Sequence, residues 1–236
     1  MTFPIRCKLK RARLEIWIAA GCALLLMSGQ ASASGSQLWT GGAATVKLSD
    51  KWALSQDLTA RFSDDKHGLY EVELNTLLGY RLSKNVALWA GYTHDPNYSG
   101  GHFRIMEHRF REQVTIDNFA DLGGGKLSGR VRLEQRWRDG LNGTGWRVRP
   151  FLRYTLPLRP GGKTALTISE EPFIDFNQTA FQKVKGLDRL RTFVGIATPL
   201  GKHVKCEFGY LNQYGFVPGR KNTVDNVASA TLSLSF

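Results

Sequence analysis

The segment DNVASATLSLSF, residues 225–236, alternates between two kinds of side chain and ends on an aromatic residue. Ala228, Ala230, Leu232 and Leu234 share one parity, and mostly hydroxyl-bearing residues occupy the other. A period of two is the pattern of a β-strand, because successive side chains point to opposite faces. One oily and one hydroxylic face suit a strand between lipid and a wet lumen, although a strand of a soluble sandwich alternates in the same way.

The end of this segment resembles the C-terminal insertion signal of bacterial outer-membrane barrels, in which a final Phe is characteristic. We assign that assembly signal to Leu232, Leu234 and Phe236. The resemblance implies a location in the bacterial outer membrane. It also implies two partners, the membrane lipid and the barrel-assembly machinery, which would engage the C-terminal strand.

The first 33 residues have the features of a secretory signal peptide. A basic start is followed by an apolar run at 16–27 and by the small residues Ala31-Ser32-Ala33. The run is too short to form a membrane-spanning helix. We therefore predict a signal peptide at 1–33 and a single outer-membrane β-barrel domain at 34–236.

The cysteines and the charge of the chain narrow the alternatives. Cys7 and Cys22 lie in the predicted signal, which leaves Cys206 alone and rules out an intrachain disulfide framework. The residues before Cys22 also fit a lipobox, but a lipoprotein normally turns polar after its cysteine, and here the apolar run continues. Removal of the signal lowers the net charge of +12 by four, to +8.

Period-two segments with turn residues between them fill the rest of the chain, and no segment has a convincing helical period. They are longer than the roughly five or six residues usual in soluble sheets. We predict an all-β fold, a transmembrane antiparallel up-and-down β-barrel of about 10–12 strands, and favour twelve because single-chain bacterial barrels have even numbers. The eleven segments recognised are 38–48, 52–62, 70–82, 86–94, 104–118, 127–138, 146–157, 164–176, 188–198, 203–214 and 225–236.

The connections between these segments alternate in length. Tight turns at 49–51, 83–85, 120–126, 159–163 and 201–202 alternate with polar loops at 63–69, 95–103, 139–145, 177–187 and 215–224. Outer-membrane barrels have short periplasmic turns and longer outer loops. The alternation therefore predicts that the loops lie at one end of the barrel and the turns at the other.

Charged side chains share one face of several segments. Arg130, Arg132, Glu134, Arg136 and Arg138 alternate with Val131, Leu133, Gln135 and Trp137. Such ladders fit a closed interior in which guanidinium and carboxylate groups pair across strands; the alternative is the solvated face of a soluble sheet. The opposite face carries aromatic residues that could form interfacial girdles, Trp52, Phe62, Tyr70, Tyr80, Tyr92, Trp137, Trp146 and Tyr154. The residues predicted to line the lumen are Arg109, Arg111, Arg130, Arg132, Glu134, Arg136, Arg147, Arg149, Arg153 and Arg189.

Several motifs resemble the bacterial family known only as domain of unknown function 2490, whose members are predicted outer-membrane barrels. The resemblance supports the fold and implies no activity. The motifs are Lys47-Leu48-Ser49-Asp50-Lys51-Trp52 followed by Arg61, Gly79-Tyr80-Arg81-Leu82-Ser83-Lys84-Asn85, Glu107-His108-Arg109, Arg130-Val131-Arg132-Leu133-Glu134-Gln135-Arg136 and Asp188-Arg189-Leu190-Arg191.

No catalytic, metal or cofactor site is convincing in the sequence. His108 lies near Glu107, Glu112 and Ser128, but an ordinary strand residue near the lipid headgroups is the simpler interpretation. The other histidines lack metal-ligand spacing, and loop carboxylates such as Asp95 are more simply solvated than bound to calcium. The arginines do not interleave with aromatic residues, so we do not expect nucleic-acid binding.

Two function classes are therefore the main candidates, and a lipid-modifying enzyme ranks third. The first is a passive channel whose arginine-rich lumen favours small anionic solutes, because rings of Arg favour anions in a pore. The second is a closed structural, adhesive or assembly barrel, since narrow barrels can be filled by side chains. We favour a wet lumen because the arginines on the predicted inner face outnumber the acids. The sequence does not specify the permeant or the oligomeric state.

Overall fold

The computed structural model describes residues 32–236, which form eleven β-strands and one short 3-10 helix. Each predicted segment corresponds to one strand. The elements are β1 (Ser32–Lys47), β2 (Trp52–Ser63), η1 (Asp64–Lys66), β3 (Gly68–Arg81), β4 (Val86–Ser99), β5 (His102–Leu122), β6 (Gly125–Arg138), β7 (Gly145–Pro157), β8 (Ala165–Asp175), β9 (Gly186–Pro199), β10 (Val204–Gly215) and β11 (Thr223–Ser235).

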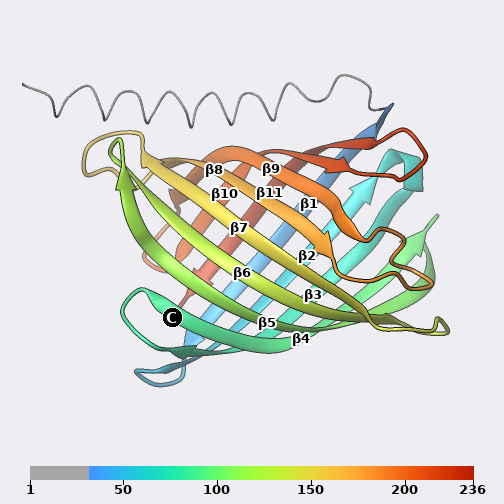
Figure 1. Ribbon diagram of the computed structural model, residues 1–236. Helices are drawn as coiled ribbons and strands as arrows, with labels where there is room; N and C mark the ends of the chain where they lie inside the picture. Colours follow the sequence, from blue (N-terminus) through green and yellow to red (C-terminus); the bar gives the residue numbers. More distant parts are fainter. Residues whose placement is uncertain (1–31) are drawn as a thin grey trace, which may run out of the picture.

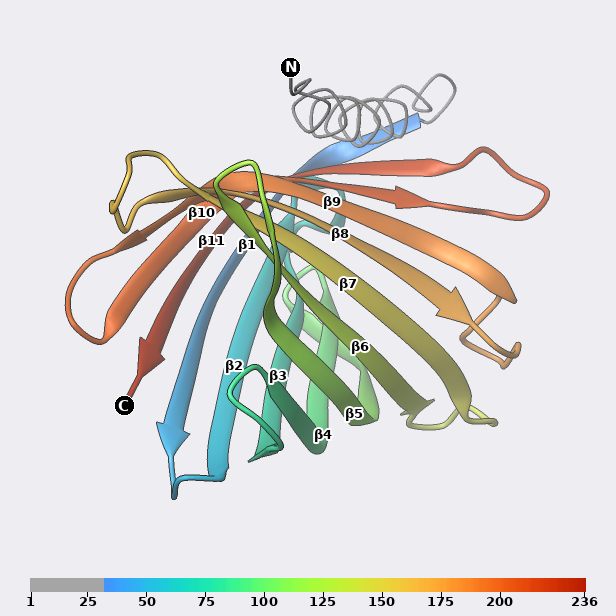
Figure 2. The ribbon, with the colours of Figure 1, turned by 60° about the vertical axis from the view of Figure 1, so that its left-hand side comes forward.

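The strands form one closed barrel in sequence order, and β1 pairs with β11 to close it (Figures 1 and 2). Neighbours in sequence pair antiparallel, whereas β1 and β11 pair in parallel, with Thr40 opposite Ala230. The predicted all-β barrel is confirmed. The preference for twelve strands was wrong over residues 32–236, because β1 pairs directly with β11 and the eleven recognised segments account for every strand described there. An odd number of alternating strands leaves the first and last pointing the same way, which makes the seam parallel.

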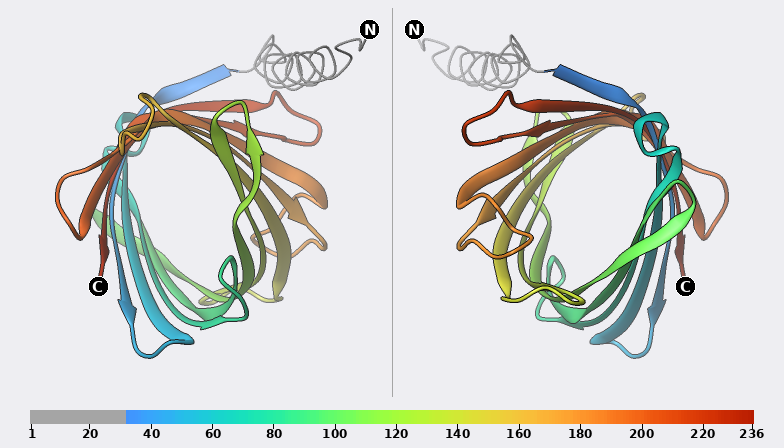
Figure 3. Two further views of the ribbon diagram at one scale, coloured as in Figure 1. Left: turned by 90° about the vertical axis from the view of Figure 1, so that its left-hand side faces the viewer. Right: turned by 90° about the vertical axis from the view of Figure 1, so that its right-hand side faces the viewer.

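The view along the barrel shows the strands as a closed ring (Figure 3). Side chains occupy the middle of the space that the ring encloses, since Glu107, Arg111 and Glu134 are fully buried there. The alternation in 127–138 places the side chains as expected: Glu134 is fully buried inside, and Val131, which has the opposite parity, is 54% exposed on the outer wall. The molecule thus buries charge inside and leaves apolar side chains outside.

The connections are sorted to opposite ends of the barrel, as predicted. We call the end with residues 48–51 and 82–85 the short-turn end, and the end with η1 and residues 176–185 the long-loop end. The predicted loop at 95–103 is wrong, because β4 and β5 continue to Ser99 and His102 and leave only Gly100 and Gly101 in the turn. Their φ angles are 59° and 77°, which a two-residue hairpin turn needs and glycine adopts readily.

A bulge in β3 turns Tyr70 toward the interior. Arg61 lies opposite Glu71 and Phe62 lies opposite Leu69, so Tyr70 is the extra residue between them. Such an insertion re-aims a side chain. Tyr70 is only 6% exposed, and its predicted place among the outer aromatic residues was therefore wrong.

The predicted signal peptide lies outside the described residues, apart from Ser32 and Ala33 at the start of β1. The same is true of the lipobox at Cys22. Both assignments, and the start of the barrel domain at residue 34, stay predictions. Within residues 32–236, no helix has the length and apolar character needed to cross a membrane.

Candidate functional site

The residues predicted to line the lumen all lie on the inner face of the barrel, where β5 to β9 bring them together. Seven of them are at most 8% exposed, which leaves Arg130, Arg153 and Arg189 more open. Their placement follows from strand alternation, because residues at i and i+2 share a face. Their part in the passage of solutes stays a prediction.

Glu134 is the centre of a network of arginines and carboxylates at the middle of the barrel. Its Oε2 lies 2.6 Å from Arg147 Nη2, and its Oε1 lies 2.8 Å from Arg149 Nη1 and 3.1 Å from Arg111 Nε. Arg132 is more distant, at 3.8 Å. A buried carboxylate needs such compensation, because the transfer of an unpaired charge out of water is costly.

Two further carboxylates extend the network around the inner wall. Glu171 on β8 accepts a hydrogen bond from Arg149 Nη2 at 2.8 Å and also pairs with Arg130. Glu73 on β3 accepts from Arg111 Nη2 at 2.7 Å. Arg111 and Arg149 therefore each bridge Glu134 to a second carboxylate, and side chains from β3, β5, β6, β7 and β8 become one continuous layer.

A second cluster surrounds Glu107, nearer the long-loop end. Its carboxylate accepts hydrogen bonds from Arg109 Nε at 2.6 Å, Arg136 Nε at 2.9 Å and Arg138 Nε at 2.6 Å. Glu107 is fully buried. Glu107 is the acidic partner that Arg136 and Arg138 share, whereas Arg109 also pairs with Glu73 and Asp95.

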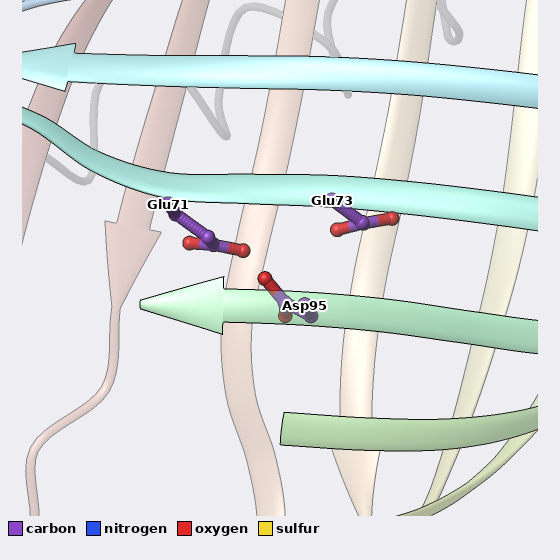
Figure 4. A group of neighbouring side chains, drawn as sticks. All are labelled: Glu71, Glu73 and Asp95. Carbon is purple, nitrogen blue, oxygen red and sulfur yellow. The ribbon is translucent and has the colours of Figure 1, made fainter. Parts of the chain in front are cut away.

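Glu71, Glu73 and Asp95 bring carboxylate oxygens within 4.8 Å of one another (Figure 4). The Glu71 and Asp95 carboxylates point toward each other from adjacent strands (Figure 4). Arg61 bonds Glu71 and Glu73, and Arg109 bonds Glu73 and Asp95. Guanidinium groups therefore already supply the counter-charge that a metal ion would bring. Asp95 lies inside the barrel and not in a solvated loop, because β4 continues past it.

A cavity with a volume of about 320 Å³ lies between the network and the long-loop end of the barrel, and we call it the vestibule. A second cavity, of about 330 Å³, lies at the short-turn end and includes Trp52, Lys84 and Phe236 in its lining. The vestibule lining includes four acidic side chains, Asp65, Glu71, Glu73 and Asp225, against nine basic ones. The basic residues are Arg61, Lys66, Arg109, Arg136, Arg138, Arg147, Arg149, Arg189 and Arg191.

Trp39 and Phe173 hold several of these arginines in place by stacking. The Arg191 guanidinium lies 4.7 Å from the Trp39 ring centroid and 4.6 Å from that of Phe173. Arg149 lies 4.1 Å from Phe173, and Arg61 lies 4.4 Å from Trp39. Stacking uses the face of a guanidinium and leaves its in-plane N–H groups available for hydrogen bonds.

The connection between β8 and β9, residues 176–185, contacts Arg136 and Arg138, two residues of the vestibule lining. Gln182 is 2% exposed and is held by both ends of its amide. Its Oε1 accepts from Arg136 Nη1 at 3.1 Å, and its Nε2 donates to the carbonyl of Asn177 at 2.8 Å and that of Trp146 at 3.2 Å. Lys66 of η1 also lines the vestibule, and burial lowers its pKa.

The enzyme candidate around His108 does not assemble as its neighbours in sequence suggested. His108 lies on the outer wall, whereas Glu107 is buried inside and Ser128 bonds the backbone of Asn118. The histidine contacts Tyr92 through Nδ1, and its Nε2 lies 3.1 Å from Asp139 Oδ1. Its ring also stacks on Trp137. These contacts fit an outer aromatic cluster, in line with the interpretation of His108 as an ordinary strand residue.

The predicted lumen-lining residues do not include Trp39, Phe173, Gln182 or Asp95, which all lie in the interior. Phe173 could have been found by parity, because it lies between Glu171 and Asp175 on the same face of one strand. Gln182 could not, because it lies in a connection whose course depends on tertiary contacts.

A family model described as "Protein of unknown function (DUF2490)" matches residues 36–224. An uncharacterised protein of Methylorubrum extorquens is 26% identical over 233 residues, which cover 93% of this chain and 97% of that protein. No solved structure gives a significant match.

Proposed function

Since the chain belongs to the DUF2490 family of proteins of unknown function, which carries no activity with it, we propose a function from its own geometry. The protein is an outer-membrane β-barrel that admits small anionic solutes through its arginine-rich interior. The observation that carries this proposal is the inversion of polarity between the two faces of the barrel wall, together with the excess of basic side chains in the vestibule.

The outer wall supports the location. Leu54, Leu58, Leu88 and Val131 are each at least 39% exposed on it, which is the reverse of a soluble protein. The strands have 11 to 21 residues, enough to cross a bilayer at a tilt. Lipid would cover this wall, and a closed barrel leaves no strand edge unpaired inside the membrane.

Aromatic residues on the outer wall gather near both ends, as interfacial girdles do. Trp52 and Tyr80 meet edge to face at 4.9 Å near the short-turn end. The ring centroids of Tyr92 and Trp137 lie 6.5 Å apart, toward the long-loop end. Because the N-terminal residues also resemble an export signal, the outer membrane is the location that we propose.

The interior supports the selectivity for anions. The vestibule offers more basic than acidic side chains, and rings of arginine attract anions into a pore. The network around Glu134 separates the two cavities, so a solute can pass only if side chains of that layer move. We therefore expect a small unit conductance in place of the large open pore that a fully wet lumen would give.

The complete burial of Glu134, Arg111 and Glu107 favours a second candidate, the closed barrel without transport. Planar-bilayer recordings of the refolded full-length mature protein in a salt gradient separate the two. The channel proposal predicts small discrete openings with a reversal potential that indicates anion preference. Absence of openings from correctly refolded, heat-modifiable protein, or a preference for cations, would overturn it.

A further inference from the structure

Arg191 differs from the other arginines of the vestibule in forming no salt bridge, although Glu171 on β8 is its register partner. Among the described side chains, no carboxylate lies within salt-bridge distance of it, and its Nε donates to Gln213 Oε1 at 2.8 Å. Gln213 is itself held by its Nε2, which donates to Asp225 Oδ2 at 2.6 Å. The guanidinium is therefore fixed at one nitrogen by a neutral group. Glu171, its register partner, forms salt bridges with Arg130 and Arg149 instead, so the positive charge of Arg191 is only partly compensated.

The two Nη atoms of Arg191 are held in place by aromatic contacts but donate no hydrogen bond to the described residues. Trp39 and Phe173 stack against the guanidinium, and no described residue accepts a hydrogen bond from its two Nη atoms. The two Nη atoms are therefore accessible from the cavity, because the fully buried side-chain nitrogens without a partner all belong to other residues. Arg191 is also part of the vestibule lining. A stacked guanidinium with free in-plane donors matches the geometry of a carboxylate, which accepts two parallel hydrogen bonds.

We propose that Arg191 is the anion-receiving residue of a binding site for sugar acids in the vestibule. The carboxylate of the solute accepts hydrogen bonds from the two Nη atoms of Arg191. Its hydroxyl groups contact the neutral polar lining, which includes Tyr70, Asn97 and Thr223. This inference rests on the proposed function only in that the solute reaches the vestibule from the long-loop end; binding itself requires no passage through the network.

The class of ligand follows from the size and chemistry of the cavity. A volume of about 320 Å³ accommodates a solute larger than a simple anion. The lining combines basic groups with neutral hydrogen-bonding side chains, which suits a molecule that carries one carboxylate and several hydroxyl groups. Hydrogen bonds to a charged group are stronger than those between neutral groups, so loss of the carboxylate contacts should weaken binding by roughly tenfold or more.

Isothermal titration calorimetry on the refolded barrel in detergent tests the site with galacturonate as the probe. Galacturonate is expected to bind, glucose to bind at least about tenfold more weakly because it lacks the charge, and acetate more weakly because it lacks the hydroxyl groups. Equal affinity for galacturonate, acetate and inorganic phosphate would mean that the vestibule attracts anions in general, and it would overturn the proposal of a sugar-acid site.

The variants assign the site to Arg191. Arg191→Gln breaks no salt bridge, and Glu171 keeps its bonds to Arg130 and Arg149, so the barrel should fold and lose galacturonate binding. Arg191→Lys should keep the charge but lose most of the affinity, because lysine lacks the planar pair of donors. Arg153→Gln is the matched control. It removes one interior charge that is paired with Glu207 outside the vestibule, and it should bind galacturonate as the wild type does.

The calorimetric result is independent of the conductance result. Binding by a barrel that does not conduct would overturn the proposed channel and keep the site. Anion conductance without galacturonate binding, or binding that Arg191→Gln leaves unchanged, would overturn the site and keep the channel.

Discussion

Glu134 on β6 lies directly opposite Arg147 on β7, and the Glu134 Oε2 atom accepts hydrogen bonds from both Nε, at 3.0 Å, and Nη2, at 2.6 Å, of that arginine. Both side chains are almost completely buried. Because water does not reach the pair, the charge of Glu134 is balanced by Arg147 itself and by Arg149 and Arg111. This dependence makes the middle of the barrel sensitive to substitution.

Glu134→Gln should reduce the free energy of unfolding by about 3–5 kcal/mol, because several buried guanidinium groups lose their shared counter-charge. Urea unfolding of the refolded barrel would measure the change in the free energy of unfolding. The temperature at which the folded band disappears on gels would give a second measure of stability. Glu112→Gln is the control, since Glu112 is exposed on the outer wall of the neighbouring strand β5. Equal stability of both variants would mean that water reaches Glu134 freely.

Arg147→Gln should destabilise the barrel more than Arg132→Gln does. Arg147 makes two short hydrogen bonds to Glu134, whereas Arg132 reaches that carboxylate only at 3.8 Å and bonds Gln113 instead. We expect a loss of about 1.5–3 kcal/mol for the first variant and about 0.5–1.5 kcal/mol for the second, which loses one hydrogen bond to a neutral group. The same unfolding assay compares them, and the reverse order would contradict the hydrogen-bond pattern of the network.

Asp95→Asn should leave the stability unchanged or raise it. The Asp95 carboxylate lies within 4.8 Å of oxygens of Glu71 and Glu73, and its Oδ1 has no hydrogen-bond partner among the described residues. The amide removes repulsion between like charges, and its oxygen can still accept the bond from Arg109. Unfolding curves are again the measurement; a loss as large as that of Glu134→Gln would show that Asp95 is needed as a charge.

A disulfide between Ala43→Cys and Ser233→Cys should form across the parallel seam, because these residues are register partners of β1 and β11 and both point inward. Cys206→Ser would be included to remove the free thiol. Non-reducing gels and mass spectrometry of the refolded protein detect the link. Ala44→Cys with Ser233→Cys is the control that should stay reduced, because its side chains lie on opposite faces. A twelfth strand between β1 and β11 would prevent the first disulfide.

Removal of Phe236 should impair insertion into the membrane. Its backbone N–H donates to Thr45 O at 3.0 Å, its carbonyl accepts from Lys47 N at 3.0 Å, and its ring stacks on His203. Phe236→Tyr keeps the ring and these bonds and should insert normally. Membrane fractionation and heat modifiability measure assembly in cells. Wild-type levels of the truncated protein in the membrane would contradict the role assigned to the C-terminal strand.

The sequence by itself determined the strands and their faces. A period of two is a local property of an extended backbone, so Leu232 and Leu234 could be placed outside and Arg130 and Glu134 inside without knowledge of the strand partners. The segments recognised by that period match the observed strands closely, and the C-terminal pattern indicated a barrel before any pairing was known.

Tertiary structure decided what local alternation cannot encode. The parallel seam depends on the total number of strands, and the inward position of Tyr70 depends on a bulge against β2. The pairing of each arginine with its carboxylates depends on register and on which side chains meet across the barrel. Arg191 and Glu134 both point inward by parity, yet Arg191 lines the vestibule and Glu134 is enclosed by arginines of β5 and β7. Register and the closure of the barrel decide which side chains meet each of them, and neither is a local property of the sequence.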